Sequence, residues 1–184
     1  VLENCTARGT DFPRLLCTSL RATGSDFEGA CFEQADIQEA EFRDCSCAAA
    51  DFRGARLNLS RMLNCDLSLC RFDGAGLLGA DLSGSRLRAA DLTDAKLDAV
   101  RLDGADLSMA ALRGKVFRDY RFVGVNFAEA DISGCDFTQA TFESCHLNSA
   151  VVSEESRFDG ADLRGAHISG SLLGKASLRG AIIT

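Results

Sequence analysis

The stretch from Gly74 to Leu112, GAGLLGADLSGSRLRAADLTDAKLDAVRLDGADLSMAAL, repeats itself every five residues. A leucine occupies the centre of each five, and a smaller residue stands two places before it. A period of five fits neither the turn of an α-helix nor the alternation of a β-strand. Self-similarity at a fixed period indicates a solenoid, in which each repeat packs on its neighbours. The central residues are Leu77, Leu82, Leu87, Leu92, Leu97, Leu102, Leu107 and Leu112.

The same register extends over the whole chain. Central residues fall on every number ending in 2 or 7 from Leu2 to Val152, and after a shift of one residue within 153–157 they resume at Phe158. Val1 and Thr184 both lie inside the repeat pattern. Because an open solenoid end exposes backbone groups and core, we expect residues 1–184 to be a single domain excised from a longer chain, or one whose ends another chain covers.

The repeat resembles the pentapeptide repeat family, whose motif is A(D/N)LXX. Ala80-Asp81-Leu82, Ala90-Asp91-Leu92 and Ala161-Asp162-Leu163 are close copies of that motif. The resemblance implies an all-β fold, a right-handed quadrilateral parallel β-helix with four fives per coil. The central residue and the one two places before it would point inward. With coils spaced by ~4.8 Å, about nine coils would give a rod roughly 43 Å long.

This arrangement predicts columns of like residues, because residues twenty apart lie above one another. Phe12, Phe32, Phe52 and Phe72 should form one stacked column in the core. The inward position two places before each centre, here called the corner position, should accept only small residues such as alanine, serine or cysteine. A bulky residue there should overpack, at a cost of ~1–3 kcal/mol.

The corner rule fails at Leu15 and Leu20, near the imperfect first coil, and at Lys115 and Tyr120. Because a lysine cannot stay buried without a partner, we expect the wall to bulge and turn Lys115 outward. The shift within 153–157 reads as a one-residue bulge, and bulges often re-aim side chains near functional surfaces. Simple distortion of a corner and drift between repeats are the alternatives. The candidate partner-docking surface consists of Lys115, Arg118, Tyr120, Arg121, Glu154, Glu155 and Arg157.

Nine cysteines and two histidines are the candidate metal or redox groups. Six cysteines occupy the corner position, and no paired CxxC spacing of the zinc type occurs, so we interpret them as reduced core residues. Cys45 and Cys65 stack one coil apart, which leaves oxidation open. His146 and His167 should share one outward column at ~5 Å. Such a pair can bind a transition metal, or the two side chains can simply be exposed on the surface. We expect no metal or cofactor.

The net charge of −7 argues against direct nucleic-acid binding, and the absence of a long apolar run predicts no membrane segment. One outward column alternates in sign: Arg21, Glu41, Arg61, Asp81, Arg101, then Arg121. No nucleophile, base and orienting group converge in the pattern, and a filled rod offers few pockets. The sequence therefore predicts a protein that is not an enzyme.

Two functions fit these observations. The first is a rigid scaffold that binds another protein, as part of a larger bacterial protein such as a secreted effector or a secretion-system component. The second, implied by the family resemblance, is a stand-alone DNA mimic that inhibits gyrase and protects it from quinolones or toxins. The expected location is the bacterial cytoplasm, or outside the cell for an effector. End-to-end pairing into a homodimer is also compatible with the open ends.

Overall fold

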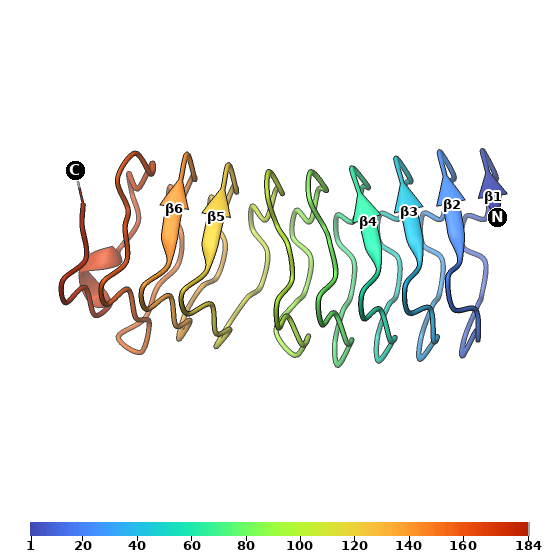
Figure 1. Ribbon diagram of the computed structural model, residues 1–184, viewed down its shortest axis with the longest axis horizontal. Coiled ribbons are helices and arrows are strands. Elements are labelled where there is room, and N and C mark those ends of the chain that lie inside the picture. The colour runs from blue at the N-terminus through green and yellow to red at the C-terminus, as the bar shows by residue number, and fades with distance from the viewer. Residues whose placement is uncertain (184) are drawn as a thin grey trace.

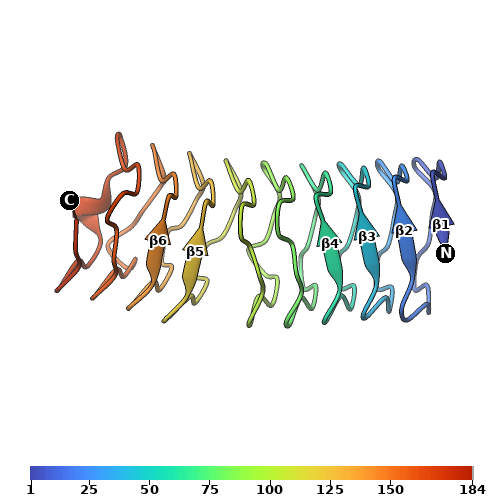
Figure 2. The ribbon, with the colours of Figure 1, turned by 45° about the horizontal axis from the view of Figure 1, so that its top comes forward.

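The computed structural model describes residues 1–183 as a rod of stacked coils with the two ends of the chain at opposite ends of the rod (Figure 1; Figure 2). Its described residues contain no α-helix. A single 3-10 turn, η1 (Leu173–Lys175), lies near the C-terminal end. The strands are very short: β1 (Leu2–Glu3), β2 (Arg21–Thr23), β3 (Glu41–Arg43), β4 (Arg61–Leu63), β5 (Arg121–Val123) and β6 (Thr141–Glu143).

Neighbouring coils pair in parallel at a spacing of twenty residues. Strands β1 to β4 form one sheet in sequence order and β5 pairs with β6, while single bridges connect the coils elsewhere. These bridges run in four ladders, which define four walls of the rod. Wall 1 carries Arg21, Glu41, Arg61 and Asp81; wall 2 Asp26, Ser46 and Asp66; wall 3 Cys31, Asp51 and Arg71; wall 4 Asp36, Arg56 and Gly76.

The predicted column of stacked phenylalanines fills one part of the core. Ring centroids are 5.1 Å apart between Phe12 and Phe32, and 5.2 Å apart between Phe32 and Phe52 and between Phe52 and Phe72. Phe32, Phe52 and Phe72 are fully buried. The prediction of like residues in register along the rod is confirmed for this column.

The corner position holds small residues because the chain turns inward there. Ser85 is buried at such a corner, where its Oγ donates a hydrogen bond to the Met62 carbonyl at 2.6 Å and accepts one from the Cys65 N–H at 2.9 Å. Ser60 occupies the same position one coil away on another wall, and its buried Oγ has no hydrogen-bond partner among the described residues. The turn itself is made by a residue with positive φ two places after each centre, for example Asn64 at 54°.

The extra residue within 153–157 lies where the ladder spacing changes. Asp131 pairs with Val151, twenty residues on, whereas Asp136 pairs with Arg157, twenty-one residues on. Ser156 is buried in this bulge, and its Oγ donates to the Ile132 carbonyl and accepts from the Gly134 N–H. The insertion is therefore held by hydrogen bonds to the preceding coil.

All nine cysteines are free thiols. Six of them are buried, and burial raises the pKa of the Cys135 thiol to about 12. Cys31 lies on wall 3 and is half-buried. A search of the described residues finds no helix with the length and apolar character needed to cross a membrane.

Candidate docking surface

Two neighbouring rungs are missing from the interior of the ladders in residues 1–183. Wall 4 lacks the bridge from Lys96 to Val116 and wall 1 lacks the bridge from Arg101 to Arg121, although the rungs on either side of each are formed. Walls 2 and 3 stay paired through this region. In both views the step between β5 and the coil before it is wider than the other steps (Figures 1 and 2). We call this opening the seam; residues 95–103 and 114–121 form its two sides.

The regular ladder would place three backbone hydrogen bonds across the seam on wall 4 and three on wall 1. Between the described residues only one of these six is formed, from the Gly104 N–H to the Val123 carbonyl at 2.8 Å, and five are missing. A polar backbone group normally finds a protein or water partner, so those facing the seam are left for water or a ligand. The groups concerned are the N–H of Leu97, Ala99, Leu102, Val116 and Arg121, and the carbonyls of Val100, Val116, Arg118 and Arg121. The Ala95 carbonyl also loses its ladder donor, but it accepts a hydrogen bond from Lys115.

Lys115 opens the wall 4 side of the seam. It occupies a corner position above Ala95, and its Nζ donates a hydrogen bond of 2.6 Å to the Ala95 carbonyl. That carbonyl would otherwise accept the Val116 N–H. The prediction that Lys115 turns outward is wrong: the side chain stays half-buried, because the carbonyl supplies the partner that a buried ammonium requires. Burial lowers the pKa of Lys115.

Tyr120 opens the wall 1 side. Its ring lies in the next corner, 4.7 Å from the Phe122 ring and 5.4 Å from the Phe117 ring, measured between centroids. Burial raises the pKa of Tyr120 to about 12. Val125 occupies the following corner and is fully buried, and the ladder beside it is intact. A corner therefore accepts valine, whereas a phenol ring pushes the preceding coil away.

The seam forms a hollow on each of the two walls. The wall 4 hollow has a volume of about 250 Å³ and is lined by residues that include Lys96, Asp98 and Val116. The wall 1 hollow has a volume of about 370 Å³ and is lined by residues that include Arg101, Asp103, Asp119, Tyr120 and Arg121. Each is large enough for one or two side chains of another protein.

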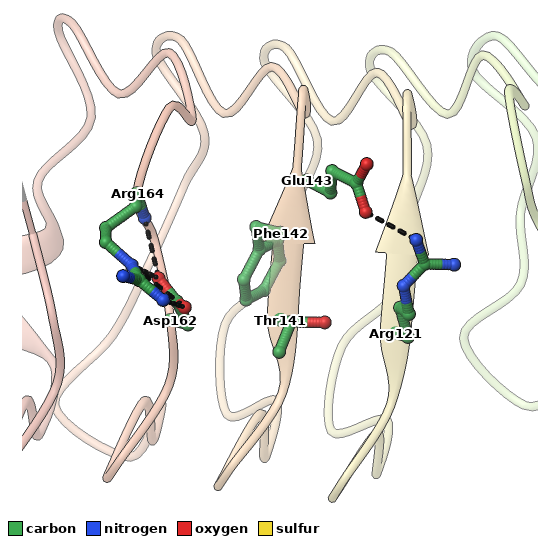
Figure 3. A pocket seen from close by; sticks show the side chains of 6 residues that line it. All are labelled: Arg121, Thr141, Phe142, Glu143, Asp162 and Arg164. Carbon is green, nitrogen blue, oxygen red and sulfur yellow. Dashed lines mark hydrogen bonds and ion pairs between the residues drawn. The ribbon is translucent and has the colours of Figure 1, made fainter.

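Two arginines of the candidate surface form ion pairs with carboxylates of the following coil. Arg118 pairs with Asp136, and Arg121 pairs with Glu143 on β6. Figure 3 shows the second pair beside a further hollow on wall 1, which Thr141 and the pair of Asp162 with Arg164 also line. The Thr141 Oγ1 is buried and has no hydrogen-bond partner within residues 1–183.

The predicted residues of the bulge lie along the same edge of the rod as Lys115. A Cβ added to Gly134 would lie 3.8 Å from Gly114 and 3.9 Å from the Glu155 carboxylate, so these three stack at the edge between walls 3 and 4. Glu154 is exposed, and Arg157 is exposed and pairs with Asp159. The two groups of candidate residues thus follow one edge and its adjoining walls, with one coil between them.

His146 and His167 are neighbours on wall 2, as the spacing predicted. Their rings are stacked, with centroids 4.6 Å apart and planes within 8°. The nearest rung carries Asn126, whose side chain is occupied by hydrogen bonds to Asp106 and to the Ala128 N–H. No group of three or more metal-binding side chains occurs within residues 1–183, so the geometry offers at most a pair of imidazoles.

Sequence reasoning missed the acidic residues of the seam. Asp98 and Asp119 look like ordinary outward positions of the repeat, and only the loss of two rungs turns them toward hollows. The structure also sets Asp94 apart, on the coil before the seam. It stands two places after a centre, where the residue normally has positive φ, and among the described residues before the bulge it is the one at this position that lacks it.

The family model for pentapeptide repeats matches residues 21–58, 45–88, 80–119, 121–153 and 155–184, in eight copies. The chain belongs to the pentapeptide repeat family. No curated protein sequence matches it.

Solved pentapeptide repeat structures share its fold. A trypsin-treated form of QnrB1, a plasmid-mediated fluoroquinolone resistance protein, matches with a TM-score of 0.89 at 20% identity, over 99% of this chain and 90% of QnrB1. HetL of the cyanobacterium Nostoc sp. strain PCC 7120, a protein involved in heterocyst differentiation regulation, matches with a TM-score of 0.56 at 28% identity, over 99% of this chain and 86% of HetL. Like the pentapeptide repeat proteins it resembles, the chain is a right-handed parallel β-helix.

Proposed function

We propose that this pentapeptide repeat rod is a rigid, non-enzymatic module that binds another protein through walls 4 and 1. The observation that carries the proposal is the seam: in an otherwise regular rod it gathers two hollows, an aromatic ring and backbone groups without partners in one place. Interfaces favour aromatic and arginine anchors beside desolvated pockets. Tyr120 and Arg121 line the wall 1 hollow, and Arg118 and Arg157 extend the surface as far as the bulge.

We infer that the rod is one module of a larger bacterial protein, such as an effector or a secretion-system component. The free thiols favour a reducing compartment before any export. A partner of this kind is a protein rather than DNA or RNA, since the surface is acidic overall.

The test is affinity capture from the source cells with photo-crosslinking at the seam. The double variant Tyr120→Ala with Arg121→Ala should lose the captured protein while its circular dichroism spectrum is unchanged. A matched variant on wall 3, Asp51→Ala with Arg71→Ala, should retain it. Equal capture by both variants would show that the seam is not part of the interface.

A DNA mimic that acts on gyrase is the second candidate, and the rod shape shared with QnrB1 favours it. The charge pattern of wall 1 opposes it, because Glu41 lies between Arg21 and Arg61 and pairs with both, at 3.8 and 3.4 Å. A sustained acidic column would suit a basic DNA channel better. Salt-sensitive inhibition of gyrase supercoiling at low micromolar protein would establish this alternative, and no inhibition at high excess would dismiss it.

A further inference from the structure

The N-terminal end of the rod presents a second surface, separate from the seam. It is the outer side of the coil formed by residues 1–20, which is the outermost coil at that end (Figure 2). We call it the N-terminal face. We propose that it binds the same face of a second copy of this chain, in a two-fold dimer whose first coils meet head to head.

The N-terminal face leaves core side chains only partly covered. No residue within 1–20 is buried, whereas the four central residues of the next coil are at most 1% exposed. Val1 and Leu16 are 85% and 83% exposed. Apolar surface gathered in one place favours a partner that removes it from water. The half-buried apolar residues of the face that pack against the core are Leu2, Ala7, Phe12, Leu15, Cys17 and Leu20.

Two of these residues make the face unlike the top of a regular coil. Leu15 and Leu20 occupy the same two corner columns as Lys115 and Tyr120, because the two pairs are separated by a whole number of coils. A corner side chain reaches toward the preceding coil, as Lys115 does to the Ala95 carbonyl, so Leu15 and Leu20 project from the N-terminal face. The seam shows that large residues in these columns keep a parallel coil from closing. The face therefore suits a contact of another geometry.

The backbone of the face is prepared for antiparallel pairing. In the next coil, the Asp26 N–H donates to the Cys5 carbonyl and the Asp26 carbonyl accepts the Ala7 N–H. Among the described residues, the N–H and carbonyl groups at the equivalent positions of the first coil, Thr6, Asp11 and Leu16, have no backbone partner. In antiparallel strands, opposed residues of this kind exchange two hydrogen bonds. A head-to-head contact makes the facing strands antiparallel.

Charge selects one register of this contact. Because the rod has four walls, two-fold symmetry allows four registers, and one of them sets a carboxylate directly opposite a basic side chain. In that register wall 1 meets wall 4 and wall 2 meets wall 3, so that Glu3 faces Arg14 of the second copy, twice by symmetry. The exposed Val1 then faces Leu16. By contrast, a register in which wall 3 meets itself would oppose two copies of Asp11, which is unfavourable.

Glu3 and Arg14 are available for such a pair. Neither forms an ion pair with another residue of the described chain, and Arg14 donates only to the neutral Gln34, at 3.2 Å. The side chains of residues 1–20 carry two acids, Glu3 and Asp11, and two bases, Arg8 and Arg14. The face is therefore balanced in a chain of net charge −7, and two copies of it meet without net repulsion.

A head-to-tail contact fits the structure less well. At the C-terminal end η1 interrupts the last coil, and within the described residues the ladder of wall 3 stops at Val151. A head-to-tail contact of rods would also repeat without closing and give a filament. The two-fold contact uses one surface twice and stops at two copies.

The test is sedimentation equilibrium of residues 1–184 from low micromolar to millimolar protein. We expect a reversible equilibrium between monomer and dimer. Leu16→Glu should abolish the dimer without changing Tm, because this side chain is exposed. The matched control Leu69→Glu, at a leucine that is 61% exposed in the middle of the rod, should leave the equilibrium unchanged.

An exchange of charges tests the register. Glu3→Arg removes two exposed ion pairs and should raise the dissociation constant of the dimer by about 2- to 30-fold. Adding Arg14→Glu to Glu3→Arg restores opposite charges only in the proposed register, and should restore the affinity.

Three results would overturn the proposal. A monomer over the whole concentration range would leave the N-terminal face to a different chain. A dimer that persists in Leu16→Glu but is lost in Ile182→Glu would assign the contact to the C-terminal end. A dimer that Leu16→Glu abolishes but that the charge exchange does not restore would reject the two-fold register. Partner capture at the seam is independent of all three, so it tests the proposed function separately.

Discussion

Replacing Lys115 and Tyr120 by alanine should close the seam, because alanine is the residue that the repeat uses at most corners. Closure would form the five missing backbone hydrogen bonds, each with a net contribution of about 1 kcal/mol. Loss of the Tyr120 ring removes about 100 Å² of buried surface, which costs about 2.5 kcal/mol. The double variant should therefore be more stable by about 2 kcal/mol, a rise in Tm of about 4–8 °C.

Amide exchange gives the sharper measurement. The N–H groups of Leu97, Ala99, Leu102, Val116 and Arg121 have no ladder partner in the structure of the unmodified chain. In the double variant their exchange should slow by at least about tenfold. The control Lys96→Ala removes a lysine from wall 4 without changing a corner, and should alter neither exchange nor Tm. Unchanged exchange in the double variant would refute the explanation that the two side chains hold the coils apart.

Three further predictions concern the rest of the rod. Phe52→Ala removes a ring stacked on both sides and should cost about 3–5 kcal/mol in urea unfolding; a loss below 1 kcal/mol would contradict the stacked core. Ser85→Ala breaks two buried hydrogen bonds and should cost about 1–3 kcal/mol, whereas Ser60→Ala removes a hydroxyl without a partner and should be neutral or stabilising. Burial raises the pKa of Asp136, but hydrogen bonds from a neighbouring threonine and arginine outweigh this effect, and the net shift of the pKa is downward from the ordinary value of 3.8. The ionised carboxylate therefore stabilises the fold above pH 3.8, and this contribution is lost as the pH falls through the lowered pKa. The difference in free energy of unfolding between the unmodified chain and Asp136→Asn should therefore shrink in acid.

Most of the fold could be predicted from the repeat. The central residues, the small corners and the shift within 153–157 each follow from a period that only a solenoid satisfies, and the phenylalanine column follows from twenty residues per coil. These features depend on sequence spacing alone. The same spacing identified Lys115 and Tyr120 as residues too large for their positions.

The response of the wall to those residues could not be derived from spacing. A lysine at a corner can turn outward or find an acceptor, and the outcome depends on the Ala95 carbonyl of a coil twenty residues earlier. Likewise, nothing in the sequence around Asp98 distinguishes it from the many outward aspartates of the repeat. Asp98 lines a hollow only because the coils separate on two walls and stay paired on the other two.

The remaining question is whether the seam is a tolerated corner distortion or a site, and the double variant separates the two. Lys115 and Tyr120 keep five hydrogen bonds from forming, so they lower stability relative to alanine at the same corners. A tolerated distortion predicts that the closed variant gains stability and loses nothing. A binding site predicts that the same closure abolishes partner capture, because stability is given up at functional surfaces for access to polar groups. A closed, more stable rod that still captures the partner would place the interaction outside the seam.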